Sequence, residues 1–313
     1  MKKFLAIVLT LALCLGIMSF AAAETYKIGV LVPEMTHGWV SGITYYAQQY
    51  ADKLAADGTI DYKVWICTNA ETMTTAIDEA VLWGAQGLVI APQWTGMEVP
   101  VQDAIDQGLV VVAFDMDIPA EGIYKVTGDN ESMGVAGAKF IVDKIGTEGT
   151  VVAMTQPNAG SVNELRMKGF KETMAEIAPN VTILEYANEA YTREVGHSVM
   201  ADVLTANAQI DAVYSEDDET SLGALQAIAE AGREDIKAIT GGGGMQEYFQ
   251  VIKETANPAC SSQTYSPMMI QDCFDVALAV LKGETPEAVV VIPSTNVDAS
   301  NVDEYLDANN TIY

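Results

Sequence analysis

Short apolar runs alternate with amphipathic stretches along this 313-residue chain, and this alternation constrains the fold more than any other feature. Residues 26–33 read as a buried strand, and residues 38–56 carry apolar side chains at helical spacing. Further strands are expected at residues 61–67, 87–91, 109–114, 149–154, 181–186, 210–215, 236–240 and 289–293. Further helices are expected at residues 71–83, 97–107, 132–145, 163–177, 193–206, 219–231 and 266–282. The pattern predicts an α/β fold with parallel sheets covered by helices on both faces.

The length and charge of the chain limit the number of domains and the kinds of partner that we expect. At about 150 residues per domain, the length favours two domains. The sequence has 43 acidic and 16 basic side chains, which gives a formal net charge of -27. This balance argues against DNA, RNA or anionic lipid as a partner, because each of them needs a basic face.

The first 23 residues have the layout of a secretory signal peptide. Lys2 and Lys3 precede an apolar stretch at residues 4–20, and alanines at 21–23 offer a cleavage site. We therefore expect an exported protein, in the periplasm or at the extracellular cell surface. A membrane anchor is the alternative, but the apolar stretch is short for a span. Lipid attachment at Cys14 is a minor alternative.

The cysteines and histidines do not predict a metal site. Cys67, Cys260 and Cys273 remain after cleavage, and an odd number leaves at least one thiol unpaired. Cys260 and Cys273 could form a bridge, although burial as free thiols is the simpler expectation. With two histidines in the chain, no zinc cluster can be assembled, and we expect no cofactor.

Carboxylates, amides and tryptophans follow the expected strands. In parallel sheets, ligands bind where the carboxyl ends of the strands meet helix N-termini. The residues at these positions are His37, Trp39, Gln93, Trp94, Asp115, Asp117, Asp129, Asn130, Asn158, Asp217, Asp218 and Gly241 to Gly244. Polar groups of this kind bind hydroxyls and indole rings stack on apolar ring faces, so the set predicts a polyhydroxylated ligand.

The chain lacks the sequence signatures of common enzymes. No G-x-S-x-G elbow, Walker loop or H-E-x-x-H helix occurs in it. A secreted carbohydrate-active enzyme that uses two carboxylates is a possible alternative, but acidic residues are so abundant that a pair means little. We expect no catalysis.

Six motifs occur in order along the mature chain: HGWV (37–40), VVAFDMD (111–117), TGDNESMG (127–134), ELRMKGF (164–170), IDAVYSEDDETSLGALQAI (210–228) and VALAVLKGE (276–284). Together they resemble the sugar-binding proteins of bacterial ABC importers, the periplasmic binding proteins of the ribose and galactose type. The resemblance implies a type I fold, with two Rossmann-like lobes joined by a three-stranded hinge. One lobe comprises residues 24–128 and 265–291, and the other comprises residues 129–264 and 292–313.

The resemblance also assigns ligand contacts to the strand ends. Trp39 matches an aromatic residue that stacks on the sugar ring, although an anchor of its helix in the core is the alternative. His37 matches a polar contact, and Asp115 matches the aspartate that accepts hydrogen bonds from two hydroxyls. Asp217 is expected to accept a further hydroxyl, whereas Asp218 is expected to cap the helix at residues 219–231.

Other contacts are expected around the same cleft. Tyr191 matches an aromatic residue of the second lobe, and Thr264 or Tyr265 lies where the third crossing supplies a polar contact. Gln93 and Trp94 follow a strand at the right place, although Trp94 could pack at the rim only.

The chain departs from the family at three positions. An arginine that often follows the strand-end aspartate is replaced by Met116. A second family arginine aligns with Glu164, which is therefore expected at the ligand, although Arg166 is close by. The family's G-F-D-G loop has become glycine at residues 241–243, where the backbone of Gly242 is expected to approach the ligand.

These departures make the expected site less basic than is usual in the family. Burying an anionic ligand beside Asp115 and Asp217 is costly, so a neutral sugar or polyol is expected. A cationic ligand such as an aminosugar or a polyamine is the alternative. We expect a monomer that delivers its solute to an ABC permease, with a ligand sensor for a signalling receptor as the alternative.

Overall fold

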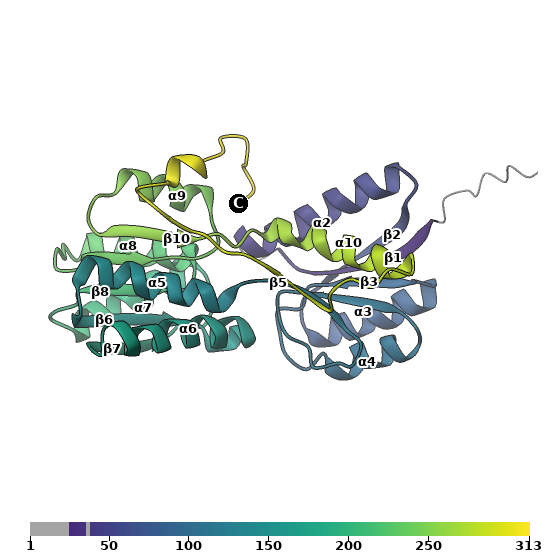
Figure 1. Ribbon diagram of the computed structural model, residues 1–313, viewed down its shortest axis with the longest axis horizontal. Coiled ribbons are helices and arrows are strands. Elements are labelled where there is room, and N and C mark those ends of the chain that lie inside the picture. The colour runs from purple at the N-terminus through teal and green to yellow at the C-terminus, as the bar shows by residue number, and fades with distance from the viewer. Residues whose placement is uncertain (1–24, 36–37) are drawn as a thin grey trace, which may run out of the picture.

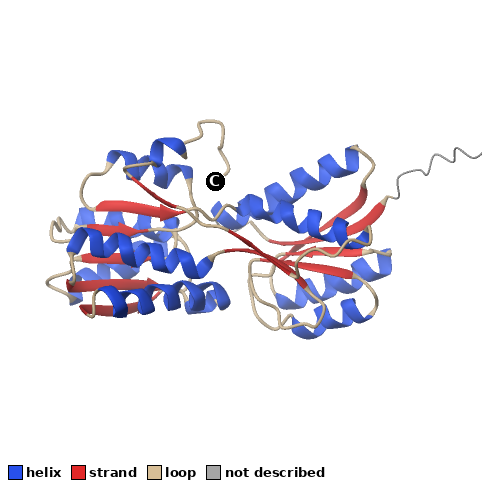
Figure 2. Cartoon of the chain, in the orientation of Figure 1, coloured by secondary structure: helices blue, strands red, loops and turns tan. Residues whose placement is uncertain are grey.

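The computed structural model describes residues 25–35 and 38–313, which form two lobes arranged side by side (Figure 1). Each lobe contains a six-stranded sheet with helices on both faces (Figure 2). The strand orders are β11-β5-β4-β3-β1-β2 in lobe one and β12-β10-β9-β8-β6-β7 in lobe two. Neighbouring strands pair in parallel, except that β10 and β12 are antiparallel. The expected two-lobed α/β fold is confirmed, whereas the signal-peptide segment and His37 lie outside the described residues.

Lobe one is a sheet whose alternating side chains enter two separate cores. Ile28, Val30 and Val32 pack toward α2 and α10, whereas Leu31 packs on the opposite face toward α3 and α4. The elements are β1 (Tyr26–Pro33), α2 (Gly38–Ala56), β2 (Ile60–Cys67), α3 (Ala70–Trp83), β3 (Gly87–Ile90), α4 (Glu98–Asp106), β4 (Val110–Phe114), β5 (Tyr124–Gly128), α10 (Ile270–Leu281) and β11 (Val289–Ile292).

Lobe two repeats this plan. Val152 and Met154 of its sheet pack toward α7, α8 and α9, whereas Val151 and Ala153 pack toward α5 and α6. The elements are α5 (Asn130–Ile145), β6 (Glu148–Thr155), α6 (Ser161–Ile177), β7 (Asn180–Ala187), α7 (Arg193–Ala206), β8 (Ala212–Ser215), α8 (Asp218–Glu230), β9 (Ala238–Thr240), α9 (Gln246–Glu254), β10 (Ala259–Gln263) and β12 (Asn296–Asp298).

The chain passes between the sheets three times. It crosses from β5 to α5 at residues 128–130, from β10 to α10 at residues 264–269, and from β11 to β12 at residues 293–295. Figure 1 shows the crossing segments lying together between the lobes. These passages lie at or beside the expected positions near residues 128, 264 and 292.

The last residues differ from the expectation that residues 292–313 belong to lobe two. Residues 302–304 form a short helical turn against α9 in lobe two. Asn310, however, accepts a hydrogen bond from the Tyr46 hydroxyl of lobe one at 3.3 Å. Tyr313 is buried in the lobe-one core cluster that also contains Trp39. Burial of this aromatic ring draws the segment across the boundary between the lobes.

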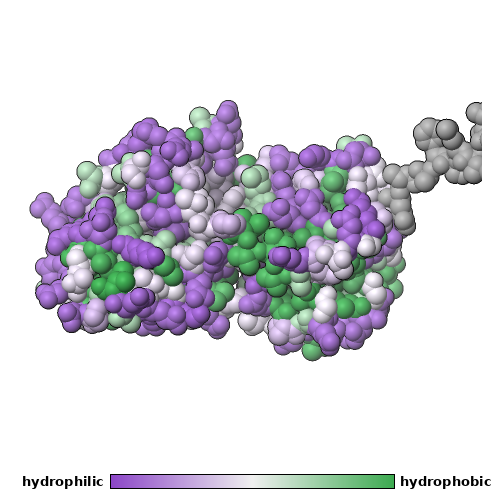
Figure 3. Space-filling model, in the orientation of Figure 1, coloured by the Kyte–Doolittle hydropathy of each residue, from purple (hydrophilic) through white to green (hydrophobic). Residues whose placement is uncertain are grey.

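The described residues contain no helix that is both long and apolar enough to span a membrane. In the view of Figure 3, apolar side chains gather on lobe one beside the boundary, whereas the same face of lobe two is more hydrophilic.

Cys67, Cys260 and Cys273 are buried and are free thiols.

Candidate functional site

A cavity of about 330 Å³ lies between the lobes, at the carboxyl ends of strands from both sheets. This volume suits a small-molecule ligand. In the sheets, Pro33 at the end of β1 pairs with Cys67 of β2, and Thr155 at the end of β6 pairs with Ala187 of β7. The loops that follow these strands supply most of the cavity lining, which brings together eight of the residues expected at the ligand: Trp39, Gln93, Trp94, Asp115, Tyr191, Asp217, Gly242 and Tyr265.

Two expected residues that the structure describes, Glu164 and Thr264, do not line the cavity. Glu164 is exposed on α6 and does not line the cavity, whereas Arg166 does. Residues two apart on a helix are about 200° apart around its axis, so the two side chains leave α6 on different faces. Thr264 lies in the second crossing, where its hydroxyl accepts a hydrogen bond from the Thr295 amide at 2.9 Å. His37 lies outside the described residues.

Asp115 follows β4 and has an unusual backbone conformation. Its φ angle is +72°, in the left-handed region that non-glycine residues seldom adopt. Its amide donates to the Val126 carbonyl at 2.8 Å, which ties this turn to β5. Its carboxylate is 5 % exposed and accepts a hydrogen bond from the Tyr265 hydroxyl. Burial raises the pKa of Asp115, because little water reaches the carboxylate.

Trp39 lies in the first turn of α2, and its ring is both a core anchor and part of the cavity wall. The indole stacks on Phe114, with ring centroids 5.8 Å apart and an interplanar angle of 14°. Its Nε1 donates to the Tyr265 carbonyl at 2.7 Å. Phe114 therefore covers one face of the ring, and hydrogen bonding fixes its orientation in the wall.

The two neighbouring aspartates of lobe two are Asp217, which is expected at the ligand, and Asp218, which is expected to cap the helix. Asp217 caps α8, since its Oδ1 accepts from the Thr220 amide at 2.9 Å, and it also lines the cavity. The expectation that Asp218 is the cap is wrong, because the helix begins at Asp218 itself. The Asp218 carboxylate is fully buried and accepts from the amides of Gly244 and Met245 at 2.9 and 2.8 Å. Burial raises the pKa of Asp217 to about 8.

Arg166 is a part of the cavity wall that the sequence did not identify as such. The side chain is 5 % exposed, and its Nε donates to Asn130 Oδ1 at 2.9 Å. One terminal nitrogen donates to the Glu216 carbonyl at 2.7 Å, and the guanidinium lies 4.7 Å from the Tyr265 ring centroid. The cavity wall therefore contains a buried arginine that is held by a side-chain amide oxygen and a backbone carbonyl.

Lobe two supplies further polar side chains to the wall. Gln156 and Asn158 follow β6, and Glu189 follows β7. Asn158 is among the residues expected after a strand, and the same signal could have identified Gln156 and Glu189. Gln156 donates from Nε2 to the Glu189 carbonyl at 3.4 Å. The Tyr191 hydroxyl donates to Glu216 at 2.8 Å, which holds the tyrosine side chain in the wall.

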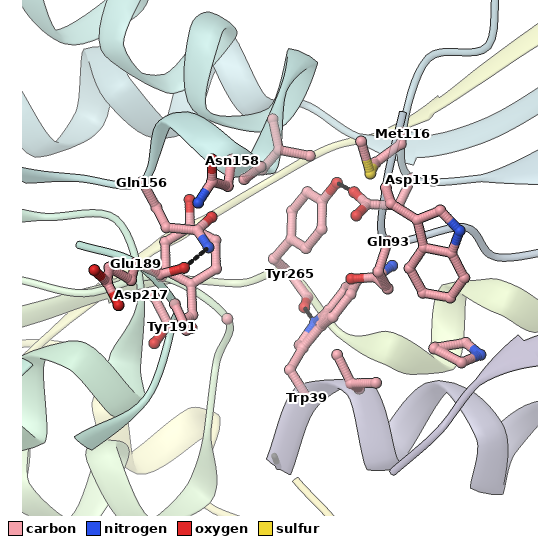
Figure 4. A pocket seen from close by; sticks show the side chains of 18 of the residues that line it. Trp39, Gln93, Asp115, Met116, Gln156, Asn158, Glu189, Tyr191, Asp217 and Tyr265 are labelled. Atoms are coloured by element: carbon pink, nitrogen blue, oxygen red, sulfur yellow. Dashed lines mark hydrogen bonds between the residues drawn. The ribbon is translucent and has the colours of Figure 1, made fainter. Parts of the chain in front are cut away.

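The side chains from the two lobes face one another across the cavity, with Tyr265 between them (Figure 4). A family model described as a periplasmic binding protein domain matches residues 28–285. The chain belongs to this family. Its sequence is 28 % identical over 312 residues to the galactofuranose-binding protein of Escherichia coli strain K12, covering 94 % of each chain. It is 26 % identical over 290 residues to the xylitol-binding protein of Mycolicibacterium smegmatis, covering 90 % of this chain and 80 % of that protein.

Solved structures of binding proteins share the fold. A galactofuranose binding protein superposes with a TM-score of 0.81 at 25 % identity, covering 92 % of this chain and 99 % of that one. A solute binding protein from Mycobacterium smegmatis, solved with glycerol, superposes with a TM-score of 0.83 at 24 % identity, covering 93 % and 100 %. The relatives are binding proteins, and this chain is a ribose- and galactose-type binding protein and not an enzyme.

Proposed function

We propose that this chain is an exported solute-binding protein that captures a small neutral sugar or polyol between its lobes and delivers it to an ABC permease. One observation carries the proposal. Asp115 of lobe one and Asp217 of lobe two are buried carboxylates at strand ends, and both line one cavity with the indole of Trp39. Carboxylates accept hydrogen bonds from hydroxyls, and an indole stacks on the apolar face of a sugar ring.

The charges around the cavity favour a ligand without an anionic group. Four carboxylates line it, those of Glu34, Asp115, Glu189 and Asp217. Arg166 is the one basic side chain among the lining residues that the structure describes, and it is already engaged by Asn130 and Glu216. A phosphate or carboxylate would add a further anionic group beside these acidic side chains, at a high desolvation cost.

The two-lobed architecture supports capture by closure. A ligand that touches both walls stabilises the arrangement in which they are close, by its difference in affinity for open and closed forms. The Asp117 amide already donates to the Ser161 hydroxyl across the lobe boundary at 3.1 Å. We infer that the closed protein acts as a monomer and that the permease recognises its shape.

The apolar segment at residues 4–20 supports export to the periplasm or the cell surface.

A thermal-shift screen of the mature protein tests this proposal. The ligands are neutral monosaccharides and polyols, with aminosugars, polyamines and sugar phosphates as the comparison classes. We expect saturable stabilisation by at least one neutral compound, because binding to the folded state alone raises its stability with ligand concentration. Stabilisation by sugar phosphates alone would contradict the proposal, and so would conversion of a stabilising sugar into product.

A further inference from the structure

Residues 307–313, which we call the strap, connect α9 of lobe two with α2 of lobe one. At the lobe-two end, Gln246, the first residue of α9, accepts a hydrogen bond from the Asp307 amide at 2.7 Å. At the lobe-one end, the Tyr46 hydroxyl of α2 donates to Asn310 Oδ1 at 3.3 Å. The strap is therefore attached to both lobes, in addition to the three crossings of the chain.

The part of the strap between these two attachments is short and turned. The Asn310 amide donates to the carbonyl of Asp307, three residues earlier, at 3.1 Å. In such a turn the two Cα atoms lie within about 7 Å of each other, and three fully extended residues span about 10 Å. The strap can therefore lengthen by only a few ångströms, and a larger separation of α2 from α9 has to break one attachment.

The ring of Tyr313, in the strap, fills space between the lobes. The side chain is 5 % exposed and belongs to the core cluster that contains Trp39. On lobe one, a Cβ atom at Gly38 would lie 3.6 Å from the ring, so the ring lies against the start of α2. On lobe two, a Cβ atom at Gly243 would lie 2.1 Å from the phenol oxygen. One buried side chain thus lies against both lobes.

The two segments that Tyr313 touches also form the cavity walls. Trp39 follows Gly38 and lines the cavity from lobe one, whereas Gly242 and Gly243 line it from lobe two. A side chain at Gly243 and the phenol of Tyr313 would occupy the same space, so the glycine makes room for the tyrosine. Tyr313 itself does not line the cavity. It therefore supports both walls from outside the space that a ligand would occupy.

We propose that Tyr313 is a positioning residue of the ligand site: its ring holds the Trp39 wall and the Gly242–Gly243 wall in place relative to each other, and the strap holds the ring. This inference rests on the proposed function, since it concerns affinity at the same cavity. A ligand that contacts both walls binds more weakly when the walls are less fixed, because part of the binding free energy is then used to order them.

The variant Tyr313→Ala removes the ring from between the walls. We expect the dissociation constant to rise about tenfold, because the walls lose their common support. The melting temperature should also fall, since a buried aromatic ring is lost. Tyr313→Phe is the conservative rescue, because it keeps the ring and removes a hydroxyl that has no hydrogen-bond partner among the described residues. Its affinity should stay within about twofold of the wild type.

Tyr26→Ala is the matched control for a loss of stability alone. Tyr26 belongs to the same core cluster as Tyr313 and is 8 % exposed. It lies at the start of β1, whereas the cavity lies at the other end of that strand, beside Pro33. We expect Tyr26→Ala to lower the melting temperature and to leave the dissociation constant within about twofold of the wild type.

Two milder variants loosen the strap and leave the ring of Tyr313 intact. Gln246→Ala removes the attachment to lobe two, and Tyr46→Phe removes the hydrogen bond to Asn310 on lobe one. We expect about two- to threefold weaker binding in each, because the ring is then held by fewer contacts. These variants decide the inference if Tyr313→Ala does not fold: weaker binding in both supports it, and wild-type affinity in both overturns it.

Calorimetric titration with the neutral sugar or polyol that most stabilises the wild-type protein gives the result. Weaker binding by Tyr313→Ala, with wild-type affinity in Tyr313→Phe and Tyr26→Ala, supports the inference. Unchanged or tighter binding by a folded Tyr313→Ala overturns it and leaves the proposed function intact. An equal loss of affinity in Tyr26→Ala also overturns it, because stability alone would then explain the effect. If no neutral sugar or polyol binds the wild-type protein, the proposed function fails and the inference fails with it.

Discussion

The two walls of the cavity differ in chemistry. The wall from lobe one is mostly apolar, and its polar members are Glu34, Thr68, Gln93 and Asp115. Its apolar members are Pro33, Trp39, Val40, Cys67, Trp94 and Met116. The wall from lobe two is mostly polar, with Gln156, Asn158, Arg166, Glu189, Tyr191 and Asp217. Asp115 is the buried carboxylate of the apolar wall, and it has no such neighbour among the residues of that wall that the structure describes.

This contrast indicates how a neutral polyhydroxylated ligand would be divided between the lobes. A sugar has apolar C–H surfaces and a rim of hydroxyls, which suit an apolar wall and a polar wall respectively. Under the proposed function, we expect Asp115 and Trp39 of lobe one each to provide a large share of the binding energy. We expect several polar groups of lobe two to share the ligand hydroxyls, so that the loss of one of these groups weakens binding less.

The largest effect is expected from Asp115→Asn. Asparagine tolerates the left-handed backbone that Asp115 adopts, but it replaces a charged acceptor with an amide. We expect affinity for the stabilising sugar to fall by about 100-fold, because a buried hydrogen bond to a charged group contributes about 1.5–3 kcal/mol. Titration calorimetry measures this loss. The control is Glu164→Gln, which makes the same change on an exposed side chain outside the cavity and should stay within twofold of the wild type.

An intermediate effect is expected from Trp39→Leu. Leucine keeps an apolar side chain but loses the stacking surface and the hydrogen bond to the Tyr265 carbonyl. We expect about tenfold weaker binding, together with a lower melting temperature, since aromatic contacts contribute about 0.5–1.5 kcal/mol beyond burial. Trp65→Leu is the control, because Trp65 packs edge-on against Trp83 away from the cavity. Equal losses of affinity in both variants would contradict a ligand role for Trp39.

The smallest effect on affinity is expected from Asp217→Asn, with a loss of about fivefold. Asparagine still caps α8, so the helix is preserved.

The same variant changes how stability depends on pH. Burial raises the pKa of Asp217 from 3.8 to about 8, so the folded state favours the protonated carboxyl. The contribution of the protonated Asp217 carboxyl to the free energy of unfolding is complete below about pH 4. It is lost as pH rises to about 8.

Thermal melts of the ligand-free proteins at pH 5 and pH 8 measure this dependence. Asparagine does not ionise, so Asp217→Asn should gain melting temperature relative to the wild type at pH 8, by at least about 2 °C more than at pH 5. Glu216 and Asp218 are also buried with raised pKa values, so some pH dependence persists in the variant. If the melting temperatures of Asp217→Asn and the wild type differed by the same amount at pH 5 and pH 8, this result would contradict a raised pKa for Asp217.

The sequence predicted the fold well where strands are apolar. The runs at β1, β4 and β6 pack into cores on both faces of a sheet, and such runs are readily identified. The expected strands did not include β5, β10 and β12. The segment of β10, residues 259–263, reads ACSSQ, and that of β12 reads NVD. These hinge strands lack long apolar runs, so their pairing depends on contacts between distant segments.

The site was predictable in so far as it depends on strand ends. Residues within a few positions of a strand end, such as Asp115 and Gln93, can be identified once the strands are known. The choice between Glu164 and Arg166 required the orientation of α6 relative to the sheet, which a single sequence does not provide. The hydrogen bond from Tyr265 to Asp115 joins residues that are 150 positions apart, so it became visible only in the folded chain.

The central claim is that one neutral solute contacts both walls at once. Titration calorimetry of the wild-type protein with its most stabilising sugar or polyol, repeated on Asp115→Asn and on Asp217→Asn, tests it most directly. We predict one bound ligand per chain and a weaker dissociation constant in each variant, with the larger loss in Asp115→Asn. Wild-type affinity in either variant would place the ligand on one lobe only and would contradict the account.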